Sequence, residues 1–360
     1  MWQWKKFKQC HINRNKQEKI QPYELDTHIK KIKNGKKCFA PKEWQKHCDK
    51  KIIRAHTISK SVNLKRIADT NNQFYSFSRS AKIHGPQLKK IGINQASTYN
   101  IFCSKHDAQL FSLIENRKFA LENDQIFLIA YRNICYELYL KERIYQTRLE
   151  RMQFDRGLNQ YEQINFQNHI QLDNLGTFYA IKELSTLKEQ YDECLIQKDF
   201  SKVRYYCITI NQTPQFMASA CWIPTKSFDG ANLANLDDTA TFYNTISASI
   251  TSYLDNQGII IFSWLESDAM EDKYCNTFVK SLDSLPMSKK LGGILNWFFT
   301  FTENLFIQPT WWDNLEQKNK EKLIECIGDT NETTLLQTNY SDFSQLTSWE
   351  ILSIRHNLKY

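Results

Sequence analysis

The stretch that decides the fold reads Cys38-Phe-Ala-Pro-Lys-Glu-Trp-Gln-Lys-His-Cys48, then Lys51-Ile-Ile-Arg-Ala-His56-Thr-Ile-Ser59, and later Phe102-Cys-Ser-Lys-His106-Asp107. Three of the ten cysteines and a Cys-x-x-His pair fall within it. Zinc takes four sulfur or nitrogen ligands in a tetrahedron, and proteins usually supply them as two close pairs. The stretch therefore predicts a zinc site formed by Cys38, Cys48, Cys103 and His106, which would hold a hairpin and a helix together.

The two predicted ligand pairs differ in how well their spacing matches that of known zinc sites. Cys103 and His106 stand where apolar residues begin to recur with helical spacing, and the first turn of a helix directs residues i and i+3 toward one point. The exposed N–H groups of that turn also favour a thiolate. Nine residues separate Cys38 from Cys48, which is long for a zinc knuckle, so His47 is an alternative ligand. The competing interpretation is that these cysteines are unrelated thiols and that Cys103 is simply buried.

Composition favours a cytoplasmic protein without a membrane span. The N-terminus is polar and basic and lacks an apolar signal-peptide core, and no apolar run approaches the ~18–20 residues that a spanning helix needs. In the cytoplasm, spaced cysteines bind metal more often than they form disulfides. Seven cysteines have no partner at ligand spacing and are predicted core residues: Cys10, Cys135, Cys194, Cys207, Cys221, Cys275 and Cys326.

Charge is unevenly distributed along the chain. Residues 1–107 hold 24 lysines and arginines against 7 acidic residues, a net +17, which leaves 23 against 32, a net −9, for the remainder. Aromatic residues are interleaved with the N-terminal charges, as is typical of nucleic-acid binding: Trp2, Trp4, Phe7, Tyr23 and Trp44. We expect nucleic acid to bind the basic N-terminal region and a protein to bind the acidic C-terminal region. The alternative is a solvated basic tail without a dedicated partner.

A knuckle, a β-hairpin and a helix with two zinc ligands resemble the treble-clef arrangement, whose nuclease members are the HNH endonucleases. In that family a histidine ending the first hairpin strand is the general base, and a residue just after the second helical zinc ligand binds a divalent ion at the scissile phosphate. The resemblance, which covers residues 38–135, implies that His56 is the base. It also implies that Asp107 binds Mg²⁺ or Mn²⁺, to which a carboxylate is suited. The segment from Ala55 to Glu115 is similar as well to a recurrent type of bacterial protein to which we attach no activity.

The sequence departs from the HNH pattern at several positions. The family has an acidic residue before the histidine, where this chain has Ala55, and 46 residues lie between His56 and Cys103. The asparagine that orients the histidine is not identifiable, with Asn63 and Asn100 as candidates. His56 is therefore interpreted as a catalytic base, as a buried hydrogen-bonded histidine, or as a fourth zinc ligand.

Patterning predicts an α+β protein in four parts: a partly ordered basic arm at 1–37, a small zinc-held, treble-clef-like module at 38–120, a helical connector at 121–200, and a larger mixed helix and sheet domain at 201–360. Strands are predicted at 50–58, 74–77, 203–210, 216–223 and 259–264. Helices are predicted at 125–154, 175–198, from Asp237 to Gly258, and at 269–283, 289–304 and 313–327.

The C-terminal part carries no phosphate-binding loop and no nucleophile elbow. Trp311-Trp312 is expected to pin a loop to the core. Asp237-Asp238 is expected to cap a helix, and Glu266 and Asp268 are minor site candidates after an apolar strand. Glu303-Asn304 stands out without an assigned role.

Three functions are compatible with these observations. The first is an HNH-like metal-dependent nuclease that acts on DNA or RNA, with bacterial phage defence as a setting. The second is a non-catalytic zinc module that binds nucleic acid or a protein. The third is a structural zinc protein.

Overall fold

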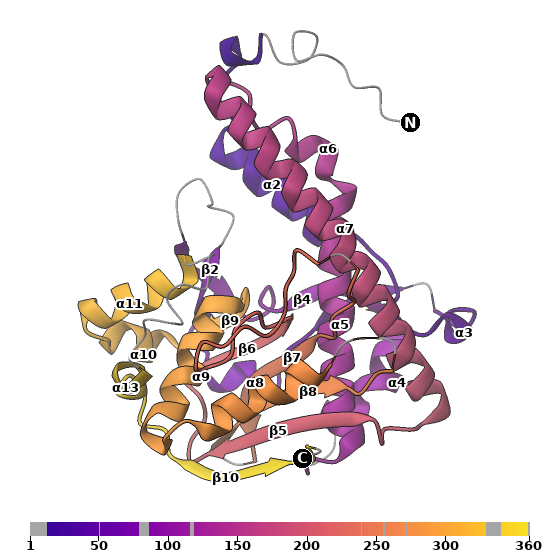
Figure 1. The fold of residues 1–360 in the computed structure, drawn as a ribbon, viewed down its shortest axis with the longest axis vertical. Coiled ribbons are helices and arrows are strands. Elements are labelled where there is room, and N and C mark those ends of the chain that lie inside the picture. The colour runs from indigo at the N-terminus through magenta and orange to yellow at the C-terminus, as the bar shows by residue number, and fades with distance from the viewer. Residues whose placement is uncertain are drawn as a thin grey trace.

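The computed structural model describes residues 13–49, 51–78, 86–115, 119–238, 240–254, 256–268, 270, 272–328 and 340–358. The predicted mixture of helices and sheet is confirmed (Figure 1). The helices are η1 (Arg14–Lys16), α2 (Pro22–Lys33), α3 (Lys42–Gln45), η2 (Leu64–Arg66), α4 (Ser104–Glu115), α5 (Asn123–Gln146), α6 (Arg148–Arg151), α7 (Gln160–Gln197), α8 (Lys273–Ser284), α9 (Met287–Phe301), α10 (Pro309–Asn314), α11 (Gln317–Gly328) and α13 (Tyr340–Ser344). The strands are β1 (Ile52–His56), β2 (Gln73–Ser78), β3 (Gln87–Gly92), β4 (Thr98–Cys103), β5 (Val203–Ile210), β6 (Phe216–Trp222), β7 (Ile246–Tyr253), β8 (Gln257–Leu265), β9 (Asn304–Ile307) and β10 (Ile351–His356).

One antiparallel sheet organises most of the chain. Its eight strands follow the order β10-β5-β8-β7-β6-β9-β2-β3. The predicted strands at 203–210, 216–223 and 259–264 are therefore confirmed as β5, β6 and β8. Strand β2 joins this sheet through β9, where Tyr75 pairs with Ile307. Since β2 and β3 lie within the predicted zinc module, the predicted boundary at residue 120 does not separate two sheets.

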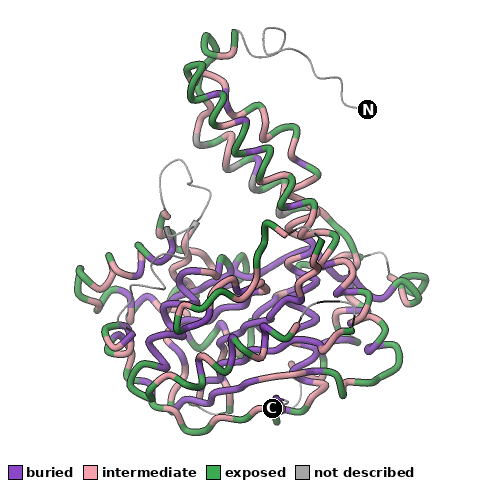
Figure 2. The backbone as a smooth tube through the Cα atoms, in the orientation of Figure 1, coloured by how far each residue is buried: buried purple, intermediate pink, exposed green. Residues whose placement is uncertain are grey.

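The two faces of the large sheet bury different helices, because alternate strand residues point to opposite faces. Along β5, Tyr206, Ile208 and Ile210 belong to the core shared with α8, α9 and α11. Val203 and Cys207 belong to the core shared with α4, α5 and α7. The sheet is thus the middle layer of a three-layer body, whose interior is buried throughout (Figure 2).

A second, two-stranded sheet ends in one of the predicted zinc residues, Cys103. Strands β1 and β4 pair antiparallel, with Ile52 opposite Cys103 and His56 opposite Thr98. Helix α4 begins at Ser104, directly after β4. The segment 57–97 between the two strands supplies the β2–β3 hairpin to the large sheet. This arrangement fixes the small hairpin and helix against the main body.

The basic arm is helical over the part that the structure describes. Helix α2 lies beside α5, α6 and the N-terminal half of α7 in a projection from the body (Figure 1). Arg143 donates to the Ile32 carbonyl at 3.2 Å, and Tyr139 donates to the Gly35 carbonyl at 2.9 Å. Within the predicted basic arm, residues 22–33 therefore form a helix that is held against the body. Trp2, Trp4, Phe7 and Cys10 lie outside the described residues.

The helix predicted from Asp237 to Gly258 is wrong. Residues 246–253 form strand β7, with Ile246, Ala248 and Ile250 buried on one face and serines between them. This alternation has the period of a strand, and the β-branched residues favour it. Asp238 accepts from the backbone N–H of Ala240 at 3.0 Å in a loop.

Among the described helices, none combines the length and the apolar character that crossing a membrane requires.

Candidate metal centre and adjoining hairpin site

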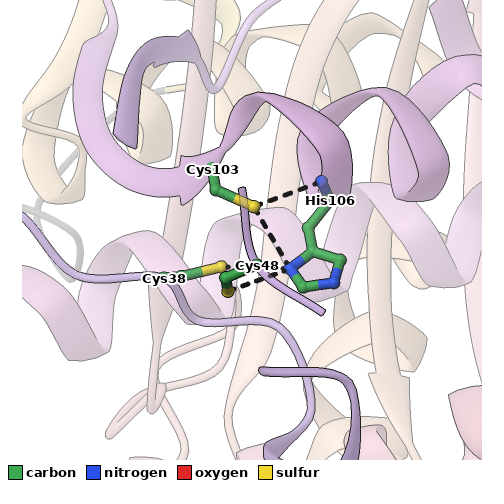
Figure 3. A group of neighbouring side chains, drawn as sticks. All are labelled: Cys38, Cys48, Cys103 and His106. Atoms are coloured by element: carbon green, nitrogen blue, oxygen red, sulfur yellow. Dashed lines mark hydrogen bonds between the residues drawn. The ribbon is translucent and has the colours of Figure 1, made fainter. Parts of the chain in front are cut away.

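Four side chains from separate parts of the sequence converge at the base of the small hairpin. The ligand atoms of Cys38, Cys48, Cys103 and His106 all lie within 4.8 Å of one another (Figure 3). The His106 Nδ1 lies 3.4 Å from the sulfurs of Cys38 and Cys48 and 3.3 Å from that of Cys103. A tetrahedral zinc ion with ordinary Zn–S and Zn–N bonds separates sulfur from nitrogen by about 3.5 Å. The cluster therefore has the composition and spacing to hold a metal ion such as zinc.

Backbone pairing brings the distant cysteines to the helix. The N–H groups of Lys37 and Phe39 donate to the carbonyls of Asn100 and Ile101 at 3.1 and 2.9 Å, which holds Cys38 against β4. Cys48 follows the short helix α3, and the Trp44 ring of that helix lies 6.5 Å from the His106 ring. His47, the alternative ligand, is exposed and lies outside the cluster.

Asp49 fastens the knuckle to the start of α4. Its carboxylate accepts from the Ser104 hydroxyl and from the Lys105 N–H at 3.2 Å. It also accepts from the Lys51 N–H at 3.1 Å. These hydrogen bonds lower the pKa of Asp49, and the bond from Ser104 contributes most. An anionic cap at a helix N-terminus satisfies otherwise unpaired N–H groups. Its position next to Cys48 means that the cap also holds that ligand in place.

Two thiols of the cluster, those of Cys38 and Cys48, resist ionisation by themselves. Burial and the neighbouring Cys38 thiol raise the pKa of Cys48 to about 12. Burial also raises the pKa of Cys38 and lowers that of His106. Metal binding requires thiolates and neutral imidazole, and a cation reverses the repulsion between adjacent thiolates. The donor set thus fits a thiophilic cation.

His56 ends β1, and its backbone pairs with Thr98 of β4. Its Nε2 lies 3.4 Å from the Ile93 carbonyl, to which an Nε2–H group would donate, leaving the lone pair on Nδ1. Burial, followed by the charges of Lys60 and Arg132, lowers the pKa of His56. The imidazole is therefore neutral at pH 7. The candidates for an orienting asparagine, Asn63 and Asn100, make their hydrogen bonds elsewhere. The Asn63 side chain accepts from Ser252, and the Asn100 backbone carbonyl accepts from the Lys37 N–H.

Asp107 lies in the first turn of α4. Its Oδ1 is buried and has no hydrogen-bond partner in the part of the chain that the structure describes. Burial raises the pKa of Asp107 to about 6, although the Arg132 charge acts against the rise. A buried carboxylate oxygen without a donor is costly unless a proton or a cation meets it.

Arg132 of α5 is a site residue that the sequence did not indicate. It is 4% exposed, stacks on the Phe111 ring at 3.9 Å and pairs with Glu115 at 2.7 Å. The charges of Arg132 and Glu115 act on the pKa of both His56 and Asp107, so these side chains share one neighbourhood. Within the described residues, the group that unites three or more potential metal ligands is the Cys₃His cluster alone.

A buried polar network joins this site to the large sheet. The Asn304 amide lies 2.8 Å from Thr57 Oγ1, 3.2 Å from Ser97 Oγ and 2.6 Å from Ser219 Oγ. Thr57 directly follows His56, and Asn304 begins β9. The network therefore explains why Asn304 is polar inside the core, and it holds the end of β1 in register with β6 and β9.

Two adjoining hollows open beside the Ile93 carbonyl that faces His56. They measure about 460 and 490 Å³ and share Asn72, Ile93 and Asn94. Lysines and amides dominate the remaining lining: Lys60, Ser61, Lys65, Asn71, Gln73, Lys90, Gly92 and Gln95. Lys60 donates to Asn94 at 2.6 Å. Lysines give the hollows a basic character, and segment 57–97 supplies all of the lining residues.

The other residues that stood out in the sequence have structural roles. Trp311 donates to the Leu346 carbonyl at 3.0 Å, and Trp312 packs against Phe77 with ring centroids 5.5 Å apart. The pair was predicted to pin a loop, but it lies in helix α10 and packs that helix against the core. Glu266 forms an ion pair with Arg204.

Comparison of the chain with protein-family models, with curated proteins and with solved structures finds no match.

Proposed function

We propose that this chain is an HNH-like, metal-dependent nuclease in which a zinc-held hairpin and helix of treble-clef type carry the catalytic residues. One observation carries the proposal. His56, at the end of β1, and Asp107, in the first turn of α4, both lie within the influence of the Arg132 and Glu115 charges, and Asp107 directly follows the cluster residue His106. An effector role in bacterial phage defence belongs to the same proposal.

His56 would act as the general base. Its lowered pKa keeps the imidazole neutral, and the Ile93 carbonyl orients the ring so that Nδ1 can take a proton. Water would lose a proton to Nδ1 and form a bond to phosphorus, and the bond from phosphorus to the leaving oxygen would break. The products are a phosphate monoester and an alcohol.

Asp107 would contribute to a Mg²⁺ or Mn²⁺ site. Its unpartnered Oδ1 fits a hard cation, and such ions commonly bind through one or two carboxylates together with substrate phosphate and water. A bound divalent ion would supply charge stabilisation at the scissile phosphate. Ala55 cannot supply the acidic ligand that the family has before the histidine, so the protein would contribute few ligands to the divalent ion.

The basic hollow beside His56 supports nucleic acid as the substrate. Lys60, Lys65 and Lys90 offer charges for phosphates, and the asparagines and glutamines offer donors and acceptors for sugar and base edges. A single strand or a groove edge laid across this surface would bring a phosphate toward His56.

The test is cleavage of plasmid DNA and of RNA with Mg²⁺ or Mn²⁺. Wild type is compared with His56→Ala and with His47→Ala, a matched control at an exposed histidine of the same module. We expect loss of cleavage in His56→Ala alone, with zinc content and stability retained, because His56 makes one long hydrogen bond. Equal cleavage by wild type and His56→Ala would exclude the catalytic role.

A non-catalytic zinc module that binds nucleic acid or a protein is the second candidate. Two observations favour it: Ala55 replaces the acidic residue, and the buried Arg132–Glu115 pair lies beside His56 and Asp107. It predicts salt-sensitive binding with no cleavage by any variant.

A further inference from the structure

Helix α7 carries a face that the body of the protein does not cover. The helix has 38 residues, and its N-terminal half forms the projection together with α2 and α6 (Figures 1 and 2). Gln163, Gln167, Ile170 and Thr177 turn one side of this half inward. On the opposite side, large apolar side chains are exposed at helical spacing.

The uncovered face is apolar and nearly free of charge. Tyr161, Ile164, Leu172 and Leu175 are 74, 43, 69 and 52% exposed, and with the exposed Asn168 they fall on one side of the helix, which we call the α7 stripe. The charged residues between Tyr161 and Tyr179 are Glu162, whose carboxylate caps the helix, and Asp173, which pairs with Arg151.

We propose that the α7 stripe binds the same stripe of a second copy of this chain, with the two helices antiparallel around a two-fold axis at Asn168. The spacing of the stripe is symmetric about that residue. Ile164 then lies opposite Leu172 of the second copy, and Asn168 lies opposite Asn168. Tyr161 lies opposite Leu175. An isologous contact requires this self-complementarity. If residue i of one copy contacts residue j of the other, then residue j of the first copy must contact residue i of the second.

A glycine on the exposed side supports close approach of a second helix. Gly176 lies inside α7, where glycine weakens a helix, and a Cβ added there would meet nothing within 4 Å. Folding of the described chain therefore gives no steric reason for glycine. In the proposed register, Tyr161 of the second copy lies opposite Leu175, next to Gly176, and the missing Cβ lets the two backbones come closer there.

Charge decides between a second copy and a polyanion. The stripe offers no lysine or arginine to phosphates, so nucleic acid would gain no electrostatic attraction there. An uncharged apolar stripe suits another uncharged apolar stripe. The stripe spans 15 residues, from Tyr161 to Leu175, about 22 Å of helix, and a two-helix contact of that length lies at the small end of specific interfaces. We therefore expect a reversible dimer.

The first experiment is sedimentation velocity of the full chain across about 1 to 200 µM, a range suited to a weak interface. Wild type is expected to shift from monomer to dimer as concentration rises. Leu172→Glu is expected to remain monomeric, because it places a charge opposite the apolar Ile164 side chain in both halves of the interface. Leu352→Glu, at a residue that is 51% exposed on β10, is the matched control and should dimerise like wild type.

The second experiment tests the antiparallel register. Ile164→Lys and Leu172→Glu should each be monomeric alone. Mixed together, they should form a heterodimer, because the introduced ammonium of one variant meets the introduced carboxylate of the other, while the second half of the interface keeps its Ile164–Leu172 contact. A parallel arrangement would not be rescued in this way. Wild type that stays monomeric throughout, a dimer that persists in Leu172→Glu, or a mixture that stays monomeric would each overturn the proposal.

Discussion

If the cysteine cluster holds a structural metal ion, Cys103→Ser should destabilise the protein strongly. Cys103 is fully buried, ends β4 and lies 3.3 Å from His106 Nδ1. Serine keeps the size of the side chain but replaces a thiolate donor with a hydroxyl that binds zinc poorly. The substitution therefore removes one of four ligands at the junction of the knuckle, the hairpin and α4.

The expected loss of stability is large. A structural zinc ion contributes about 10–16 kcal/mol of apparent binding free energy in small zinc domains, so one ligand in four accounts for about 3–4 kcal/mol. Whole proteins are stable by only about 5–15 kcal/mol. We expect Cys103→Ser to unfold the hairpin and α4 and to lower the denaturation midpoint by about 5–10 °C.

The assay combines elemental analysis with thermal unfolding, each with and without a zinc chelator. Cys207→Ser is the matched control, since Cys207 is equally buried but lies on β5 outside the cluster. It should keep its zinc and lose only about 1–3 kcal/mol, from burial of a hydroxyl. If Cys103→Ser keeps the zinc content of wild type and responds to the chelator as wild type does, the cluster is not a metal site.

Three further outcomes are expected. Burial lowers the pKa of His56, so its base form persists at pH values below the ordinary histidine pKa of about 6.5. The acid limb of a pH profile of kcat/KM should therefore have its midpoint below that value. A midpoint above it would contradict the assignment of His56 as the base. Asn304→Ala should destabilise the fold by about 2–4 kcal/mol in urea unfolding, because it leaves buried hydroxyls unpaired, whereas the exposed Asn314→Ala should change stability by less than about 0.5 kcal/mol. Lys65→Ala and Lys90→Ala should each reduce the salt dependence of nucleic-acid binding by about one phosphate contact; unchanged slopes would remove the basic hollow from the binding surface.

The cysteine and histidine cluster could be predicted because its information is local. Cys103 and His106 are one helical turn apart, so the sequence alone brings them together. Cys38 and Cys48 needed the extra assumption that a knuckle folds back on β4. Hydrogen bonds from the Lys37 and Phe39 N–H groups hold the knuckle against β4 in the structure, and no pattern in the sequence predicts them.

Strand β7 shows how a local signal can mislead. Asp237 and Asp238 resemble a helix cap, yet they lie in a loop well before the strand begins. The alternation of Ile246, Ala248 and Ile250 with serines was the better indicator. Its serines meet a polar patch, since the Asn133 amide donates to Ser247 and Ser249 at 3.0 and 2.9 Å. Buried serines on one face weakened the apolar signal of the strand, and the segment was therefore predicted as a helix.

The surroundings of His56 could not be predicted from the sequence. Arg132 lies in an apolar stretch of α5 and reaches the site only because α4 and α5 pack together. Asn304 contacts Thr57 across 247 positions of sequence. Both residues are polar groups inside otherwise apolar patterns, and tertiary packing alone determines which side chains they meet.

The most direct test of the proposed nuclease is divalent-ion-dependent cleavage by zinc-loaded protein, measured side by side for wild type, His56→Ala and His47→Ala on DNA and RNA. We predict cleavage by wild type and His47→Ala and none by His56→Ala, with equal zinc in all three. Cleavage that survives in His56→Ala would contradict the account, and zinc-loaded wild type that binds nucleic acid without cutting it would establish the non-catalytic module instead.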